Sequence, residues 1–329
     1  MKVKALYVKD YMELEHGVME LNDELKADEV LVKTKACGIC TWDSTLYQGV
    51  NIPGPYPFTL GHEGVGVVEK VGSLVTDFKP GDNVFTGRGG SGTDQFAEYY
   101  INKDKGLWKL PDGDIDNWAS VVYEPTCCVV NALNAIDIQM GDHVVLVAAG
   151  YMGLQTIMGL ANASQAGEIT VFEPNSDRIE LAKKYLGSDT VYNPLSDEGK
   201  AVIKAIQDKG GADVVIEFGG NAATFALSDS LTKAAGKLAI AGFHRDNVEF
   251  YGPKWHLGGL TVYNVAPDIN KYFMLEIPSR TFTMIQKGVY KPAELVTHVA
   301  DFEDLAKVKE IFDRSVDKKD DYMKGVVLF

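Results

Sequence analysis

The sequence predicts an α/β protein in which a small β-rich unit precedes a doubly wound parallel sheet. Up to about residue 123, short alternating apolar runs are punctuated by glycine and proline, which is typical of strands joined by irregular loops. From about residue 131 onward, apolar runs of strand length alternate with helical stretches of ten or more residues. Such repeats build a parallel sheet, because parallel neighbours require helical crossovers. At 329 residues, the chain suits about two domains of roughly 150 residues each.

The expected parallel strands are apolar throughout, as strands covered on both faces are. They are the runs HVVLVAA, EITVFEP, ADVVIEFGG and GKLAIAGF, which begin at residues 143, 168, 212 and 236. A helix is expected over residues 176–186, with Asn175 or Ser176 capping its start and Gly187 ending it. We expect domain boundaries at 1–123 and 124–266, and a tail, 267–329, that returns to the β-rich unit.

Composition excludes several classes of partner. The chain has 32 Lys and Arg against 46 Asp and Glu, a net charge of -14, and no long basic stretch, so nucleic acid is not an expected partner. The apolar stretch 144–163 contains three glycines and lacks flanking aromatic or basic anchors, so we interpret it as a buried strand and helix and not as a membrane span. Four cysteines and a lysine-studded N-terminus favour the reducing cytoplasm.

A glycine-containing turn follows the first expected parallel strand. It runs from Ala148 through Ala149, Gly150, Tyr151 and Met152 to Gly153, and resembles a GxGxxG turn whose first glycine is alanine. Gly150 would let a pyrophosphate approach the backbone, and Gly153 would let the helix pack close to the strand. The phosphates would then meet the N–H groups at the helix start, so the turn predicts a dinucleotide site.

An acidic residue ends the next expected strand. Glu173 lies twenty residues beyond Gly153, where this fold places a carboxylate that binds the ribose hydroxyls. A carboxylate there repels the extra phosphate of NADP, which favours NAD, although Arg178 could soften that exclusion. The alternative is that Glu173 only ends a strand and solvates it. His244 follows a later parallel strand, at the edge where ligands gather, and is a further candidate for cofactor or substrate contact.

Cys37 and Cys40 form a CxxC motif. This motif has three possible explanations: half of a zinc finger, a dithiol switch, or a single metal ligand beside a second cysteine that binds no metal. Cys127 and Cys128 adjoin one another and cannot supply a second CxxC. Catalytic zinc takes three protein ligands and leaves one position open. Cys40 offers a thiolate, and the segment LGHEGVGVVEKVG offers His62 and Glu63 between glycines. Glu124, in YEPTCCVVNAL, is a candidate third ligand.

The chain resembles the zinc-dependent medium-chain dehydrogenases/reductases, nearest to the sorbitol and threonine dehydrogenase branches. The segments ACGICTWD, GHEGVGVVEKVG, GDNVF, FAEYY and EPTCCVVNAL and the glycine turn occur in the family's order over essentially the full length. The resemblance implies a GroES-like catalytic domain over 1–123, a Rossmann NAD-binding domain over 124–266 and a return to the catalytic domain over 267–329. It also implies a homodimer or homotetramer.

Residue by residue, the resemblance makes Cys40, His62 and Glu124 the zinc ligands and Glu63 an alternating ligand or a close neighbour of the metal. Asp43 matches the carboxylate that orients the liganding histidine. Cys37 falls at a position that carries no metal in the family.

Two departures from the family pattern bear on the metal and on the mechanism. The segment TGRGGSGTDQFAEYY lacks the four cysteines that hold a structural zinc in many relatives, so one catalytic zinc is expected. Trp42 and Thr45 replace the residues that commonly carry the alcohol proton to solvent, and indole cannot relay a proton. We therefore expect water, Thr41, Thr45, Glu63 or Glu124 to do so, and Trp42 to form a wall of the substrate pocket.

The expected function is reversible oxidation of a secondary alcohol, such as a polyol, sugar alcohol or hydroxy acid, to a ketone with zinc and NAD. Two alternatives stay open: a zinc-free, NADPH-dependent quinone or enoyl reductase of the same superfamily, and an NAD-binding protein without turnover. The side chains expected at the substrate are Trp42, Glu124 and Asn264, with Tyr47 and Trp255 as further candidates.

Overall fold

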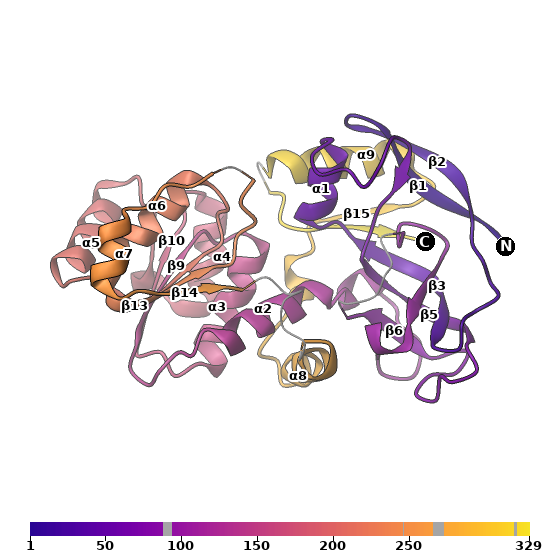
Figure 1. The fold of residues 1–329 in the computed structure, drawn as a ribbon, viewed down its shortest axis with the longest axis horizontal. Helices are drawn as coiled ribbons and strands as arrows, with labels where there is room; N and C mark the ends of the chain where they lie inside the picture. The colour runs from indigo at the N-terminus through magenta and orange to yellow at the C-terminus, as the bar shows by residue number, and fades with distance from the viewer. Residues whose placement is uncertain (88–93, 246, 266–272, 319–320) are drawn as a thin grey trace. The chain divides into compact units, whose positions relative to one another are not determined.

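The computed structural model describes residues 1–87, 94–245, 247–265, 273–318 and 321–329. The chain forms two compact units (Figure 1). Unit 1 comprises Met1–Cys127, Asn270–Thr283 and Lys291–Phe329, and unit 2 comprises Cys128–Ile269 and Met284–Tyr290. None of the helices in these described ranges is both long and apolar enough to cross a membrane.

Unit 2 contains a six-stranded parallel sheet, which confirms the doubly wound fold class. Its strand order is β11-β10-β9-β12-β13-β14, so the chain starts at the centre, moves outward on one side, and then crosses to the other side. The strands are β9 (His143–Val147), β10 (Glu168–Phe172), β11 (Val191–Tyr192), β12 (Ala212–Glu217), β13 (Thr232–Ile240) and β14 (Thr261–Asn264). The four apolar runs singled out in the sequence supply β9, β10, β12 and most of β13.

Helices connect these strands and lie around the sheet (Figure 1). They are α3 (Tyr151–Ala163), α4 (Ser176–Leu186), α5 (Asp197–Asp208), α6 (Ala222–Leu231) and α7 (Gly252–Gly258), with a 3-10 turn η3 (Ser188–Thr190). Helix α4 begins as expected, because the Asn175 side chain accepts hydrogen bonds from the N–H groups of Asp177 and Arg178. Gly187 ends it with a φ of 94°. A core of valine, leucine and phenylalanine side chains, including Val145, Phe172 and Leu238, holds the sheet and helices together.

Unit 1 is built from two sheets. The smaller sheet has the order β2-β1-β4, and the larger has the order β15-β16-β3-β5-β6-β8 with β7 paired to β3. The strands are β1 (Lys2–Asp10), β2 (Glu13–Glu20), β3 (Glu29–Gly38), β4 (Phe58–Thr59), β5 (Glu63–Val71), β6 (Asn83–Thr86), β7 (Tyr99–Lys103), β8 (Leu107–Lys109), β15 (His298–Asp301) and β16 (Gly325–Leu328). Strand β16, from the end of the chain, pairs antiparallel with β3, so Val326 faces Gly38.

The N-terminal part of unit 1 is not purely β, because a short helix, α1 (Thr41–Tyr47), follows β3. The later helices are α8 (Phe273–Gln286), whose last residues belong to unit 2, and α9 (Leu305–Asp317). The 3-10 turns are η1 (Asp104–Gly106), η2 (Trp118–Val121) and η5 (Pro292–Leu295). Helix α2 (Glu124–Ala135) begins in unit 1 and ends in unit 2. The core beneath α1 and α9 includes Tyr47, Phe96 and Phe312.

Candidate functional site

The pairing of β3 with β5 brings the candidate metal ligands to one end of the larger sheet of unit 1. Gly38, the last residue of β3, lies opposite Glu63, the first residue of β5. Cys40 follows two residues after Gly38, and His62 comes one residue before Glu63. A Cβ atom on Gly38 would collide with the Glu63 carboxylate, so this glycine leaves the space that the carboxylate occupies.

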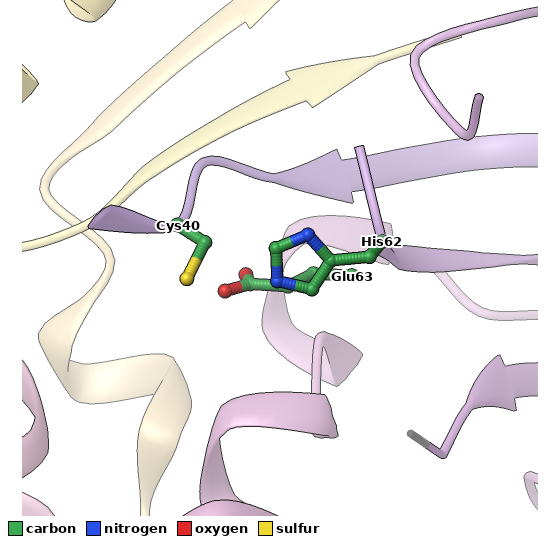
Figure 2. A group of neighbouring side chains, drawn as sticks. All are labelled: Cys40, His62 and Glu63. Carbon is green, nitrogen blue, oxygen red and sulfur yellow. The ribbon is translucent and has the colours of Figure 1, made fainter. Parts of the chain in front are cut away.

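Cys40, His62 and Glu63 converge on one point (Figure 2). Their ligand atoms, one sulfur, one imidazole nitrogen and one carboxylate oxygen, all lie within 4.8 Å of one another. Zinc takes sulfur, nitrogen and oxygen donors, and three protein ligands are the usual set at a catalytic zinc. The donor set therefore fits zinc, and among the described residues it is the group of three such side chains that could hold a metal ion.

The Asp43 carboxylate accepts hydrogen bonds from the backbone at Cys40 and from the backbone just before His62. Asp43 lies in the first turn of α1 and is 1% exposed. One carboxylate oxygen, Oδ2, accepts a hydrogen bond from the Cys40 N–H at 2.9 Å, and the other, Oδ1, accepts from the Gly61 N–H at 3.2 Å. Oδ1 also lies 3.6 Å from Nδ1 of His62. The carboxylate therefore orients the imidazole so that Nε2 is left for a metal.

The backbone before His62 is shaped by Gly61. Gly61 has a φ of 102°, a left-handed conformation that side chains with a Cβ rarely adopt. A Cβ atom there would lie 2.7 Å from the backbone nitrogen of Phe96 and 3.1 Å from the Cys37 sulfur. Gly61 therefore permits the tight approach that places His62 beside Asp43.

The charges around His62 favour its protonated form in the metal-free protein. Burial alone lowers the pKa of the imidazole, but the Asp43 carboxylate and the Cys40 sulfur outweigh burial and raise the pKa well above its usual value. A divalent cation would replace the proton between these same negative groups.

Lys324 contacts Glu63, which sequence reasoning missed. Its ammonium forms a buried ion pair with Oε2 of Glu63 and donates a hydrogen bond to the Ile39 carbonyl at 2.9 Å. Lys324 precedes β16, and the pairing of β16 with β3 brings it to the ligands. The only signal in the sequence was a single lysine before an apolar run, which is common and predicts no site.

Glu124 and Cys37, the other two residues considered for the metal site, lie outside the group of three. Glu124 is the first residue of α2 and is 3% exposed, but it is not in the group within 4.8 Å, whereas Glu63 is. Cys37 lies in the hydrophobic core, where burial, with a contribution from the nearby Asp43 and Glu63 charges, raises the pKa of its thiol. Residues 88–93, in the segment from which a structural zinc is predicted to be absent, lie outside the described residues.

Trp42, Thr45 and Tyr47, which were expected at the substrate pocket or considered for proton transfer, all lie on α1. Trp42 is 37% exposed. Thr45 is fully buried and its hydroxyl donates to the Thr41 carbonyl at 2.8 Å, a geometry that ties it to the helix backbone and does not suit a proton relay. Tyr47 is also fully buried, and its hydroxyl lies 2.6 Å from the Met12 carbonyl oxygen and 2.8 Å from a carboxylate oxygen of Asp313, so it belongs to the core.

The glycine turn of unit 2 lies between β9 and α3, and Gly150 is the residue that caps the helix. A Cβ atom on Gly153 would collide with the carbonyl oxygen of Ala148, so glycine is needed there for the helix to start so close to the strand. A Cβ atom on Gly150 would meet nothing within 4 Å, which leaves open space beside the backbone. Ala148, in place of the usual first glycine, has a φ of 77°. Tyr151 and Met152 open the helix.

Glu173 directly follows β10, and its carboxylate is hydrogen-bonded to the glycine turn. It is 2% exposed, so it does not simply solvate the end of a strand. Oε2 accepts a hydrogen bond from the Ala149 N–H at 2.7 Å, and Oε1 accepts from the Asn175 N–H at 2.9 Å. Each carboxylate oxygen has a second lone pair, so the group could still accept a bond from a ribose hydroxyl. Arg178 lies in the first turn of α4, and Asn264 is an exposed residue at the end of β14.

Two family models match the chain. The Alcohol dehydrogenase GroES-like domain matches residues 26–112, in unit 1. The Zinc-binding dehydrogenase domain matches residues 152–267, in unit 2.

Known proteins agree with these matches. L-threonine 3-dehydrogenase of Caldanaerobacter subterraneus subsp. tengcongensis is 31% identical over 248 residues, which cover 67% of this chain and 70% of the relative. Sorbitol dehydrogenase of Bacillus subtilis is 26% identical, with 99% and 97% of the two chains covered. The crystal structure of an Escherichia coli oxidoreductase/dehydrogenase of unknown specificity has a TM-score of 0.86 at 26% identity and covers 100% of this chain and 99% of that chain. The chain therefore belongs to the zinc-type alcohol dehydrogenases of the medium-chain dehydrogenase/reductase family.

Proposed function

We propose that this oxidoreductase interconverts a secondary alcohol and a ketone, with one catalytic zinc and NAD. The convergence of Cys40, His62 and Glu63 within 4.8 Å carries the proposal, because it supplies a sulfur, a nitrogen and an oxygen donor at one point. A zinc ion held there would act as a Lewis acid on the hydroxyl of the substrate, and NAD supplies the hydride acceptor.

The residues of this chain would have distinct tasks. Cys40, His62 and Glu63 would hold the metal, and Glu124 is proposed as the ligand or substrate-side carboxylate that the family resemblance implies. Asp43 would keep the imidazole of His62 in one orientation through Oδ1, 3.6 Å from Nδ1. Trp42, which is 37% exposed on α1, is proposed as a wall of the substrate pocket. Asn264 is proposed separately as a substrate contact, from the sequence alone.

The preference for NAD is proposed from Glu173. Its carboxylate is buried and hydrogen-bonded to the turn at Ala149, so it cannot easily move away from a ligand at that turn. A phosphate on the adenosine ribose would face this negative charge, whereas a free hydroxyl could donate a hydrogen bond to it. We expect kcat/KM to be at least about tenfold higher with NAD than with NADP, a difference of about 1.4 kcal/mol.

The substrate class is proposed from the relatives, which are named as sorbitol and threonine dehydrogenases. Their substrates suggest a secondary alcohol flanked by further polar groups, such as a polyol, a sugar alcohol or a hydroxy acid. We also propose that the protein works as a homodimer or homotetramer, which sedimentation velocity would measure.

A spectrophotometric screen tests the proposal as a whole. Polyols, secondary alcohols and primary alcohols are offered with NAD and with NADP, to protein that has been treated with a chelator and to protein reloaded with zinc. We expect turnover of a secondary alcohol that depends on zinc and prefers NAD. Faster turnover of simple primary alcohols would overturn the substrate class.

Two other outcomes would favour the alternatives. Reduction of quinones or enones with NADPH by the zinc-free protein would identify a zinc-independent reductase of the same superfamily. Tight binding of zinc and NADH without turnover of any alcohol in the panel would identify a nucleotide-binding protein that lacks the activity.

A further inference from the structure

Unit 2 has a second group of buried polar side chains, at the end of the sheet where a dinucleotide is expected. The chain leaves the central strand β9 toward β10 on one side and returns to β12 on the other side. Ligands of such sheets lie outside the carboxyl ends of the strands, at the point where the strand order reverses. The glycine turn and Glu173 follow β9 and β10 on one side of this point. On the other side, Glu217 is the last residue of β12, and His244 follows β13.

Glu217 lies immediately beside the start of the glycine turn. It pairs with Val147, the last residue of β9, and Val147 precedes Ala148. The N–H of Phe218 donates a hydrogen bond to the Val147 carbonyl at 3.0 Å, which ties the end of β12 to the beginning of the turn. The Glu217 side chain is therefore placed at the edge of the expected dinucleotide site, although it is 0% exposed.

Three donors hold the Glu217 carboxylate. Oε1 accepts hydrogen bonds from the Gly220 N–H at 2.7 Å and from the Thr224 hydroxyl at 2.6 Å. Oε2 lies 2.8 Å from Nε2 of His244. The loop that carries His244 approaches closely at Gly242, where a Cβ atom would lie 2.5 Å from the Gly220 nitrogen and 2.8 Å from Oε2 of Glu217. This close approach positions the imidazole.

The bond to Glu217 fixes what His244 offers at its other nitrogen. A carboxylate only accepts, so Nε2 must carry the proton in that bond. Nδ1 is buried and has no hydrogen-bond partner among the described residues. The ring cannot turn away freely, because it also packs edge-on against Phe225, with centroids 5.9 Å apart and an interplanar angle of 89°. A buried polar atom without a partner is unfavourable, so its persistence points to a ligand.

We propose that Nδ1 of His244 binds a hydroxyl of the nicotinamide-side ribose of the cofactor, with Glu217 as the residue that orients it. The two mononucleotide-binding halves of such a sheet each take one nucleotide, and the turn with Glu173 belongs to the adenosine half. His244 lies on the other half. A ribose hydroxyl can both donate and accept, so it matches Nδ1 whether the imidazole is neutral or protonated. This inference rests on the proposed function only in requiring that the protein bind a nicotinamide dinucleotide.

Binding measurements by isothermal titration with the full-length protein test the proposal without any turnover. The ligands form a series: ADP lacks the second ribose, ADP-ribose has it without nicotinamide, and NADH has both. The variant His244→Gln keeps an amide nitrogen near the Nε2 position, where it can still bond to Glu217, but has no atom in place of Nδ1. The variant His244→Asn places a polar atom near Nδ1 and loses the bond to Glu217.

We expect His244→Gln to bind ADP as the wild type does and to bind ADP-ribose and NADH about tenfold more weakly, which corresponds to about 1.4 kcal/mol. His244→Asn should bind ADP-ribose more tightly than His244→Gln. The control is His143→Gln: His143 is a partly buried histidine at the opposite end of β9, hydrogen-bonded to Thr170 at 2.9 Å, and its replacement should change none of the three affinities.

The outcomes separate this inference from the proposed function. Unchanged ADP-ribose binding in His244→Gln, or weakening for NADH alone, would overturn the ribose contact. Weakening of ADP as well would show that His244 acts on the whole site through the fold. Tighter ADP-ribose binding by His244→Gln than by His244→Asn would place the effect in the Glu217 bond and overturn the role of Nδ1. Failure of the wild type to bind NADH or ADP-ribose would instead overturn the dinucleotide site itself.

Discussion

The ammonium of Lys324 is ion-paired with the carboxylate of Glu63, and both side chains are almost completely buried, at 4% and 1% exposed. Lys324 also donates a hydrogen bond to the carbonyl of Ile39, the residue between the end of β3 and Cys40, and this bond helps to fix its position. Breaking a buried pair by removing one partner is strongly destabilising, because the remaining charge has neither water nor a counterion. Glu63 is therefore a candidate metal ligand that already has a positive partner when no metal is bound.

The variant Lys324→Met should lower the stability of the metal-free protein by about 3–5 kcal/mol, the cost typical of an uncompensated buried charge. The loss should be smaller after zinc is added, because the metal supplies positive charge to Glu63. Thermal melting in chelator and in zinc measures both losses. Lys204→Met, which removes an exposed ion pair with Asp208, should cost less than about 1 kcal/mol in both conditions. Equal losses for Lys324→Met in the two conditions would show that Glu63 does not meet the metal.

The two cysteines of the CxxC should differ in their effect on zinc. Cys40→Ser removes the thiolate from the group of three and should reduce the zinc content well below one ion per chain, with a parallel loss of activity. Cys37→Ala should keep the zinc, because the Cys37 thiol packs in the core, and should cost only stability. Elemental analysis of protein dialysed against a weak chelator measures the metal. Equal zinc loss in both variants would contradict the assignment of Cys40 as the ligand.

The parallel sheet and the approach of Cys40 to His62 could be predicted from the sequence because each depends on local signals. The sequence favoured Glu124 as the third member of this group, where the structure has Glu63. The strand that ends at Val147 is a continuous apolar run, and the glycines at 150 and 153 mark the turn after it. Cys40 and His62 are separated by 22 positions, but each stands in a recognisable motif.

The contacts of Lys324, Thr45 and Glu173 could not be predicted, because they depend on packing that the sequence does not display. Lys324 reaches Glu63 only because β16 pairs with β3, and the two residues are 261 positions apart. The hydroxyl of Thr45 bonds to the carbonyl one turn earlier in α1, which requires knowing that residues 41–47 are helical. The burial of Glu173 follows from the N–H groups of two separate loops that meet its carboxylate.

Asp43 should control metal affinity without being a ligand. In Asp43→Asn, the amide cannot replace the negative charge beside Nδ1 of His62, and the histidine loses its fixed orientation. The loss of such an orienting carboxylate typically weakens metal binding by about 10–100-fold. Competition with a chromophoric chelator at pH 7.5 measures the affinity. An unchanged affinity would show that Cys40, His62 and Glu63 hold the metal without help from Asp43.

Asp82 should make part of the stability of unit 1 depend on pH. Burial alone would raise the pKa of its carboxyl, but hydrogen bonds from Lys109 and Lys79 outweigh burial and lower the pKa to about 2. A lowered pKa stabilises the folded state above the unfolded-state value of 3.8, and this contribution is lost as the pH falls toward 2.

In Asp82→Asn, we therefore expect a loss of about 1–2 kcal/mol near pH 7, because the lysine partners are partly exposed and solvent weakens the pair. The difference from the wild type should shrink as the pH falls from 4 toward 2, and urea unfolding at a series of pH values measures it. A difference that stays constant with pH would assign the effect of the mutation to packing.

Replacement by alanine should affect stability at only one of the two glycines of the turn in unit 2. Gly150 has a φ of -69°, and a Cβ atom there meets nothing within 4 Å, so Gly150→Ala should fold with an unchanged melting temperature. The added methyl group would, however, occupy the space that a pyrophosphate needs, and NADH binding should weaken at least about tenfold. Gly153→Ala should lower the melting temperature as well, because its Cβ atom would collide with the Ala148 carbonyl. Full NADH affinity in a stable Gly150→Ala protein would show that the pyrophosphate does not lie at this turn.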